Sequence, residues 1–231
     1  MLLSELLESL SLVELSQLAV SGESTRAIPI DMYPIVITHI NSALSQLYSK
    51  FPLKHRQVII QQYAHIANYV LHDRYARSNT TSTETYKYIM DSEFDIFTND
   101  VISVDRVFNE NGDEVSLNNA DDYYSVFTRV YNVIQTPYPE DENAWTVIYR
   151  ASPTKIDVNI EDPSTVEVEF PPHMLEALSA YVAHKALSTI NPDASSTAIG
   201  KFLRLCEDMD KYGLYNRDFN TNLKLWRNGW V

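Results

Sequence analysis

The spacing of apolar residues changes twice along this chain of 231 residues, from a helical period to a strand period and back again. Leucines near the N-terminus recur at helical spacing, which predicts a short amphipathic helix. Ser11 and Glu14 then have the S-x-x-E spacing of a capping box, so a second short helix is expected to begin there. The apolar positions of these two helices are Leu3, Leu6, Leu7, Leu10, Leu15 and Leu18.

A longer helix is predicted after the polar segment 21–29. Asp31 is placed to cap its first turn, and Pro52 is expected to end it because proline cannot continue a helix. The apolar spacing is regular, but a helix of this length is more typical of core packing than of a coiled coil. Its inward-facing positions are Tyr33, Ile37, Ile40, Leu44, Leu47 and Phe51.

Short runs rich in valine, isoleucine and tyrosine replace this pattern between Arg56 and Phe170, and they predict β-strands. Asn111 and Gly112 lie between two of these runs and tolerate a positive φ, so a β-hairpin is predicted over residues 101–117. The polar segments 77–87 and 136–144 are predicted to be loops. The predicted strands are 56–64, 65–72, 100–108, 114–118, 123–135, 145–151, 155–160 and 165–170.

Helical spacing returns after Pro171 and Pro172 and predicts a hairpin of two helices. The segment 191–193, Asn-Pro-Asp, separates them, and Gly213 stands where a helix C-terminus favours glycine. Small residues at 177, 180 and 183 would allow the second helix to approach closely. The first helix is expected to bury Leu175, Leu178, Val182, Ala186 and Ile190, and the second Ile199, Phe202, Leu203, Cys206 and Met209.

These patterns together predict an α+β fold. The N- and C-terminal helices are expected to form a small helical bundle, with a mainly antiparallel β region inserted between them and an extended C-terminal arm. Residues 1–213 are predicted to form a single domain, with helices in 1–52 and 172–213 and the β region in 56–170. Residues 214–231 form the arm.

The arm carries a stripe of apolar residues in an asparagine-rich context, and its net charge is +2 in a chain of net charge −13. Asparagine is a poor helix former, so a helix is expected there only on docking. Tryptophan and tyrosine are common interface anchors, which predicts that the arm binds a neighbouring subunit or another protein. The alternative is that the arm completes the core of its own subunit. The predicted contact residues are Tyr215, Phe219, Leu223, Trp226 and Trp230.

The acidic excess is concentrated in residues 84–123, which contain eleven acidic and two basic side chains. Such a surface repels phosphate, so a tight nucleic-acid-binding module is not expected, although acidity also serves solubility alone. Glu5 and Glu8 interrupt the N-terminal leucines and no basic region precedes them, so neither a signal peptide nor a membrane span is predicted. We therefore expect a protein of the cytoplasm and its assemblies.

The sequence contains no motif for catalysis or cofactor binding. It has five glycines, and none of them forms a Rossmann or Walker phosphate loop. The six histidines lack a metal-binding spacing, and the single cysteine, Cys206, is expected to be a small buried residue. We therefore predict no cofactor, no metal and no enzymatic activity. Weak cation binding at 121–122 or 140–142, and a hydrolase with dispersed carboxylates, stay as minor alternatives.

Four stretches resemble the head-to-tail adaptor, or connector, proteins of short-tailed bacteriophages. They are the opening LLSELLESLSLVELSQLA, the stretch INSALSQLYSKFPL at 40–53, the strand, prolines and helical hairpin of 165–213, and the terminal GWV. The resemblance covers both ends of the chain well and the middle poorly.

The resemblance implies a structural virion protein without enzymatic activity. Members of this family form homo-oligomeric rings of about twelve subunits around the DNA channel, in the neck between capsid and tail. The helices would face the portal protein and the β region the tail or nozzle protein, while DNA passes without specific binding. Assembly would occur in the host cytoplasm, with no membrane partner. A tail terminator or a baseplate component is the alternative interpretation, since it would share the acidity and the lack of active-site motifs.

Overall fold

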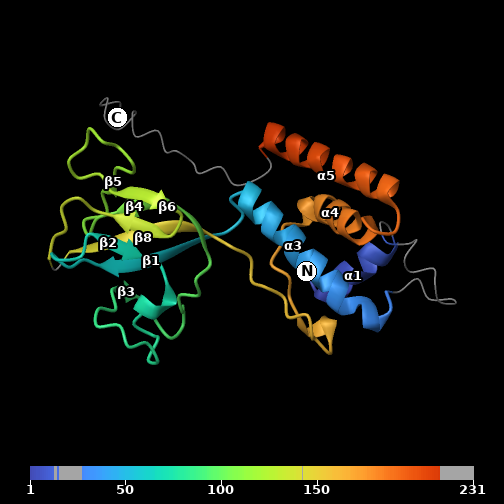
Figure 1. Ribbon diagram of the computed structural model, residues 1–231, viewed down its shortest axis with the longest axis horizontal. Helices are drawn as coiled ribbons and strands as arrows, with labels where there is room; N and C mark the ends of the chain where they lie inside the picture. Colours follow the sequence, from blue (N-terminus) through green and yellow to red (C-terminus); the bar gives the residue numbers. More distant parts are fainter. Residues whose placement is uncertain (13–14, 16–27, 142, 214–231) are drawn as a thin grey trace, which may run out of the picture.

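The computed structural model describes residues 1–12, 15, 28–141 and 143–213. Within these residues the chain forms four α-helices, one five-stranded sheet and one three-stranded sheet, which confirms the predicted α+β class. Figure 1 shows the helices from both ends of the chain gathered at one end of the molecule and the strands at the other. We call these parts the helical lobe, residues 1–53 and 152–213, and the β lobe, residues 54–151.

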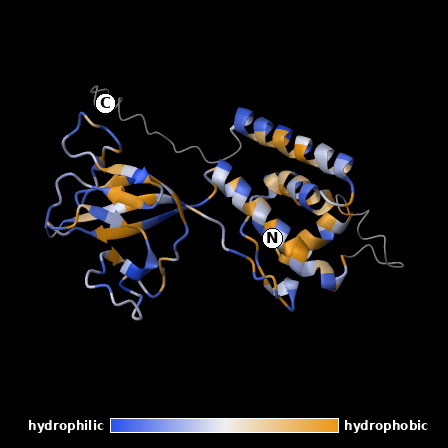
Figure 2. Cartoon of the chain, in the orientation of Figure 1, coloured by the Kyte–Doolittle hydropathy of each residue, from blue (hydrophilic) through white to orange (hydrophobic). Residues whose placement is uncertain are grey.

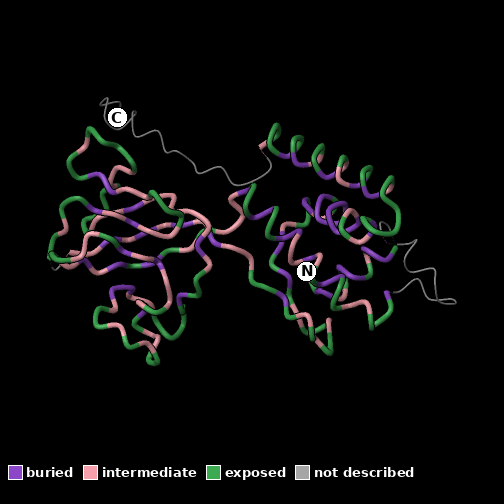
Figure 3. Tube along the Cα trace, in the orientation of Figure 1, coloured by how far each residue is buried: buried purple, intermediate pink, exposed green. Residues whose placement is uncertain are grey.

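The helical lobe contains α1 (Leu3–Leu12), α3 (Tyr33–Lys50), α4 (Leu175–Leu187) and α5 (Pro192–Tyr212). Short 3-10 turns lie at Ile30–Met32, Pro163–Thr165 and Pro172–Met174. The central helix is α4, which packs against both α3 and α5 and buries eight of its 13 residues. Figure 3 shows this concentration of buried positions in purple. The helices from the two chain ends therefore share one core.

The first helix, α1, confirms the predicted leucine stripe. Ser11 is still helical, and its hydroxyl donates to the carbonyl oxygen of Glu8 at 2.7 Å. The second short helix predicted beyond it, with Glu14 and Leu18, lies outside the described residues. The buried leucines of α1 are Leu3, Leu6, Leu7 and Leu10.

The ends of α3 follow from the prolines beside them. Pro34 lies in the first turn, where a missing backbone N–H costs little, and Phe51 ends the helix in an extended conformation before Pro52. The prediction that Asp31 caps this helix is wrong, because Asp31 belongs to the preceding 3-10 turn. The N-cap residue is Met32, which makes no side-chain cap. The buried positions of the predicted stripe are Ile37, Ile40, Leu44, Leu47 and Phe51.

The hairpin of α4 and α5 is confirmed, with two corrections. The side chain of Asn191 accepts a hydrogen bond from a backbone N–H in the first turn of α5, at 3.1 Å. Gly213 ends α5 with a φ of 63°, in the left-handed region that favours glycine. Ile190 is 64% exposed because α4 ends at Leu187, and Leu203 is 50% exposed because it lies on the outer face of α5.

The β lobe contains two antiparallel sheets. The larger has the order β3-β1-β8-β4-β5, made from β1 (His55–Gln61), β3 (Ile89–Met90), β4 (Val101–Phe108), β5 (Glu114–Val115) and β8 (Ala144–Ala151). The smaller has the order β2-β7-β6, made from β2 (Asn68–Val70), β6 (Phe127–Val130) and β7 (Val133–Gln135). The predicted strand 123–135 is thus divided into β6 and β7, which pair with each other. A 3-10 turn lies at Asp73–Tyr75.

The two sheets enclose a second hydrophobic core. Alternate residues of β1 and β8 are buried, as expected for strands that cover a core with one face. Trp145 of β8 contacts Tyr69 of the smaller sheet edge to face, with ring centroids 5.5 Å apart. Figure 2 shows the apolar residues in orange along these strands and, separately, on the inner faces of the helices. The buried residues form two clusters, one in each lobe.

The β-hairpin predicted over 101–117 is confirmed by the antiparallel pairing of β4 with β5. The side-chain oxygen of Asn109 accepts hydrogen bonds from the backbone N–H groups of Asn111, at 3.0 Å, and Asp113, at 2.8 Å. Gly112 has a φ of 83°, which glycine adopts without strain. Within this fully described turn, Asn111 keeps an ordinary negative φ, so the glycine alone uses the expected conformational freedom.

The predicted strands 155–160 and 165–170 are wrong. Both segments run through the helical lobe, and among the described residues the second makes only an isolated bridge, between Leu2 and Glu167. Asn41 of α3 holds the first segment, because its amide accepts from the N–H of Ile156 at 2.9 Å and donates to its carbonyl oxygen at 2.8 Å. The strands therefore end at Ala151 and not at residue 170.

The misleading alternation in residues 165–170 has a packing origin. Val168 and Phe170 are buried in the helical core, whereas Glu167 and Glu169 are exposed. An extended chain that lies on helices buries every second side chain, as a strand in a sheet does. The alternation of apolar and polar residues correctly indicated an extended conformation. It did not indicate whether the extended segment pairs within a sheet or packs on helices.

The buried hairpin yields a stability prediction. Leu178 of α4 is fully buried, so Leu178→Asp would place an unpaired carboxylate in the helical core and should destabilise the protein by at least about 3 kcal/mol. Urea unfolding monitored by far-UV circular dichroism measures this change. Leu203→Asp on the exposed face of α5 is the matched control and should lie near the parent. A Leu178→Asp protein with the parent's midpoint would show that α4 is not held by this core.

Candidate functional site

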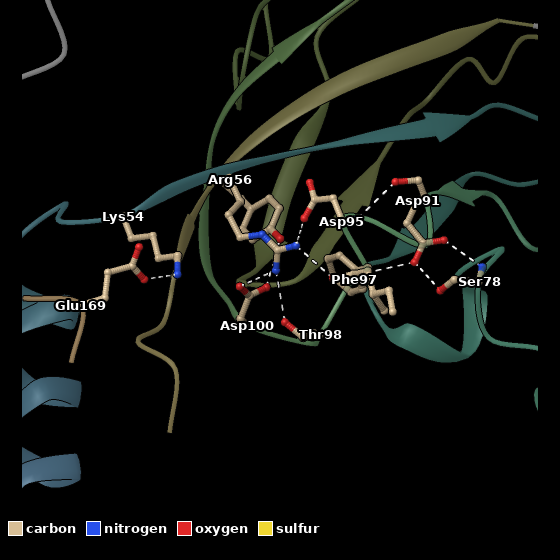
Figure 4. A network of polar contacts seen from close by, with 12 residues as sticks. Lys54, Arg56, Ser78, Asp91, Asp95, Phe97, Thr98, Asp100 and Glu169 are labelled. Atoms are coloured by element: carbon tan, nitrogen blue, oxygen red, sulfur yellow. Dashed lines mark hydrogen bonds and ion pairs between the residues drawn. The ribbon is translucent and has the colours of Figure 1, made fainter. Parts of the chain in front are cut away.

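The residues predicted to bind a partner all fall in the arm, which lies outside the described residues. Their role therefore stays a prediction from the sequence. They are Tyr215, Phe219, Leu223, Trp226 and Trp230. In the described part of the chain, a polar network at the junction of the two lobes holds the segment 91–100, which has exposed apolar side chains (Figure 4). Neither the network nor this segment was predicted from the sequence.

Three contacts fix the chain at and beside the junction. The backbone N–H of Ala151 donates to the carbonyl oxygen of Lys54 at 2.9 Å, and the Lys54 ammonium pairs with Glu169 at 2.5 Å. The hydroxyl of Tyr48 in α3 donates to the carbonyl oxygen of Glu169 at 2.6 Å. Burial raises the pKa of Tyr48 to about 12, with a further contribution from the Glu169 carboxylate, so this hydroxyl stays a donor at neutral pH.

Arg56, near the start of β1, binds four groups of the segment 91–100. Its guanidinium donates to the carboxylates of Asp95 and Asp100, the latter at 2.9 Å. It also donates to the hydroxyl of Thr98 at 3.2 Å and to the carbonyl oxygen of Ile96 at 2.9 Å. Burial alone would lower the pKa of Arg56, but the hydrogen bonds with the two aspartates outweigh burial and raise it. One side chain therefore fixes this segment at four points.

Asp91 anchors the other end of the same segment. Its carboxylate accepts hydrogen bonds from the backbone N–H of Ser78 at 2.9 Å, the Ser78 hydroxyl at 2.5 Å and the backbone N–H of Phe97 at 3.0 Å. Partial burial alone would raise the pKa of Asp91, but these hydrogen bonds outweigh burial and lower it. Asp91 is thus ionised at neutral pH and holds the segment against the preceding loop.

The segment 91–100 presents apolar side chains to solvent from this fixed backbone. Phe94 is 100% exposed and Ile96 is 51% exposed, whereas Phe97 is buried against the β lobe. Its ring meets that of Tyr149 at a centroid distance of 6.0 Å, and the Tyr149 hydroxyl donates to Asp100 at 3.0 Å. An exposed apolar residue on an ordered segment is a suitable contact for another protein, because little conformational entropy is lost on binding.

The acidic stretch 84–123 is partly neutralised by folding. Five of its eleven acidic side chains form ion pairs, and four of the basic partners come from outside the stretch in sequence. A charge counted along the chain therefore overstates the negative charge of the folded surface. The pairs are Glu84 with Arg74, Asp95 and Asp100 with Arg56, Asp105 with His55 and Arg150, and Glu114 with Arg106.

The described residues contain no group of three or more His, Cys, Asp or Glu side chains that could hold a metal ion. The hydroxyl of Ser195 lies 2.9 Å from the Nδ1 atom of His184, but Ser195 is 5% exposed and also donates to the carbonyl oxygen of His184 at 3.0 Å. This pair pins α5 to α4. Cys206 is buried, and burial raises the pKa of its thiol, so the residue packs as predicted. None of the described helices is both long and apolar enough to cross a membrane.

The Arg56 network predicts a local change in stability. Arg56→Gln would leave Asp95 and Asp100 without their cation, so the segment 91–100 should loosen and the protein should lose about 2 kcal/mol of stability. Hydrogen exchange at the Phe97 amide and urea unfolding measure the two effects. Arg74→Gln is the matched control, because its pair with Glu84 is half-exposed at 3.9 Å and contributes under about 1 kcal/mol. Unchanged exchange at Phe97 in Arg56→Gln would contradict the assigned role.

Comparison with known proteins finds no matching family for this chain, and no curated protein matches it.

Proposed function

We propose that the protein is a structural component of a phage virion, a head-to-tail adaptor that forms a ring joining the portal to the tail around the DNA channel. The observation that carries this proposal is the gathering of the adaptor-like stretches in one lobe. The described parts of these stretches, 2–12, 40–53 and 165–213, are far apart in sequence, yet the structure packs their helices into the helical lobe. The described part of the resemblance thus lies within one folded unit.

The two-lobe shape supports a joining function. The helical lobe and the β lobe have separate hydrophobic cores, so each can present its own surface to a different neighbour. In the proposed orientation, the helical lobe faces the portal and the β lobe the tail or nozzle protein, in the neck of a virion assembled in the host cytoplasm. A ring of identical subunits needs one heterologous contact, repeated between neighbours until it closes.

Electron microscopy of the purified protein, alone and mixed with the portal of its own phage, tests the proposal. Rings in either sample, stacked on the portal in the mixture, are the expected result. Separate globular particles in both samples would contradict the adaptor role and favour another virion component.

The ring model predicts that the protein does not bind DNA tightly. The chain has a net charge of −13, and the carboxylates that remain unpaired repel phosphate. A mobility-shift titration at low salt should therefore show no complex at micromolar protein. Salt-dependent binding of the strength of a basic DNA-binding protein would show that cationic residues dominate the exposed surface.

The arm gives a further prediction. Truncation after Gly213 should leave a soluble protein with near-parent thermal stability that no longer joins the portal assembly, because the arm is proposed to dock on a neighbouring subunit or the portal. Thermal unfolding and co-sedimentation with the portal measure the two properties.

A full-length variant with serine at the four aromatic positions is the matched control for chain length, and it should behave like the truncated protein. The positions are Tyr215, Phe219, Trp226 and Trp230. Insolubility or a melting temperature many degrees lower in both proteins would show that the arm completes its own subunit's core.

A further inference from the structure

A hollow of about 390 Å³ opens at the end of the β lobe opposite the junction. Its place follows from the strand register, since Gln61 of β1 pairs with Ala144 of β8 at this end, whereas His55 pairs with Arg150 at the junction. Its walls come from the residues after β1 and β4, the residues before β8, and the loops around Tyr124 and Tyr138.

Three tyrosines form the aromatic wall. The rings of Tyr123 and Tyr138 are stacked, with centroids 3.8 Å apart and an interplanar angle of 16°. The ring of Tyr124 lies nearly perpendicular to that of Tyr123, with centroids 5.2 Å apart and an interplanar angle of 81°, and Tyr124 is 72% exposed. Because Tyr124 is not stacked on another ring of this wall, its face is available to a ligand.

The loops that carry this wall are held by hydrogen bonds. Asp122 accepts from the hydroxyl of Ser116 at 2.5 Å and from the backbone N–H of Tyr124 at 3.0 Å. Asp141 accepts from the backbone N–H of Ala64 at 3.2 Å. The wall is therefore preorganised, which reduces the entropy lost on binding.

The described lining of the hollow is negatively charged. Glu110 and Glu140 line it, and among the residues that the structure describes no Lys, Arg or His does. Asn143 donates to one carboxylate oxygen of Glu140, at 3.0 Å. Glu110 has no hydrogen bond or ion pair with any residue that the structure describes, so its carboxylate is free to accept from a ligand.

Two polar side chains of the wall make no side-chain hydrogen bond with the described part of the chain. Gln62 is 2% exposed and Thr136 is 5% exposed, and both line the hollow. Neither the amide of Gln62 nor the hydroxyl of Thr136 forms a hydrogen bond with the residues that the structure describes. Neither side chain has a fully buried unpaired polar atom, so both polar groups open onto the hollow and are available to hydrogen-bond with a ligand there.

We propose that this hollow binds an arginine side chain presented by a segment of another protein. A guanidinium is planar, stacks on aromatic faces and carries five N–H donors, which matches the face of Tyr124 and the acceptors of Glu110 and Glu140. The peptide groups beside the arginine supply partners for Gln62 and Thr136. Lysine fits less well, because its compact ammonium has three donors and does not stack as a plane.

The charge of the wall decides between arginine and a neutral sugar. A sugar would also stack on tyrosine, but it would leave the Glu110 carboxylate without a counter-charge. A guanidinium supplies that charge and forms charge-assisted hydrogen bonds, which are roughly twice as strong as neutral ones. The inference goes beyond the adaptor function and uses none of the arguments for it.

The test titrates the full-length protein, labelled with ¹³C in its tyrosine rings, with the blocked tripeptide acetyl-Gly-Arg-Gly-amide. The signals of Tyr123, Tyr124 and Tyr138 should shift in a saturable way, in the millimolar range. The same tripeptide with citrulline, which has the shape of arginine without its charge, should bind about tenfold more weakly or not at all.

Variants then locate the site. The double variant Glu110→Gln, Glu140→Gln and the single variant Tyr124→Ala should each weaken arginine binding about fivefold or more. Glu93→Gln and Tyr131→Ala are the matched controls, because both residues are exposed but lie outside the hollow, and they should bind like the parent.

Three outcomes would overturn the inference: equal binding of the citrulline peptide, parent affinity in the double variant, or saturable shifts of these tyrosines with maltose but not with arginine. None of them bears on ring formation, which electron microscopy decides separately. A protein that forms rings on the portal but ignores arginine would keep the adaptor function and lose this inference.

Discussion

The helical core can form only when both ends of the chain meet. Helices α1 and α3 from the N-terminal side and α4 and α5 from the C-terminal side contribute to a single hydrophobic cluster. The chain between them must therefore leave and return at the same place. The first and last strands of the β lobe, β1 and β8, satisfy this constraint by pairing along seven residues, and the hydrogen bond from Ala151 to Lys54 closes the base of the pair. The β lobe is thus an insertion whose two ends are already adjacent.

Arg56 stands close to this base, so the junction also determines what the β lobe exposes. The carboxylates that bind it, Asp95 and Asp100, lie on the segment that leads into β4. With the segment held by these ion pairs, the side chain of Phe97 is buried and that of Phe94 is exposed to solvent. A flexible segment could hide such a phenylalanine by collapsing on nearby apolar surface. The ion pairs of Arg56 oppose that collapse because they hold the backbone of the segment in place. The exposure of Phe94 therefore follows from the folded structure of the segment.

The elements that depend on local spacing could be predicted from the sequence. The leucines of α1, the stripe of α3, the glycine at the end of α5 and the turn at Gly112 all follow from rules that act within a few residues. Rules of this kind failed where the same pattern has two structural meanings, as in 165–170, where extended chain lies on helices and not in a sheet. They also could not reach the Arg56 network, whose partners are about forty residues away along the chain. The hollow of the β lobe could not be predicted from local spacing either, because residues from four separate segments of the chain line it.

The acidic composition shows why placement matters more than count. A carboxylate that already binds an arginine, as Asp100 binds Arg56, has satisfied its charge and adds little attraction for a partner. A carboxylate without a cation keeps its field, and in a partly enclosed hollow that field is screened less than on open surface. The net charge of the chain therefore describes its general repulsion of polyanions, whereas recognition depends on the few acidic groups, such as Glu110, that folding leaves unpaired among aromatic rings.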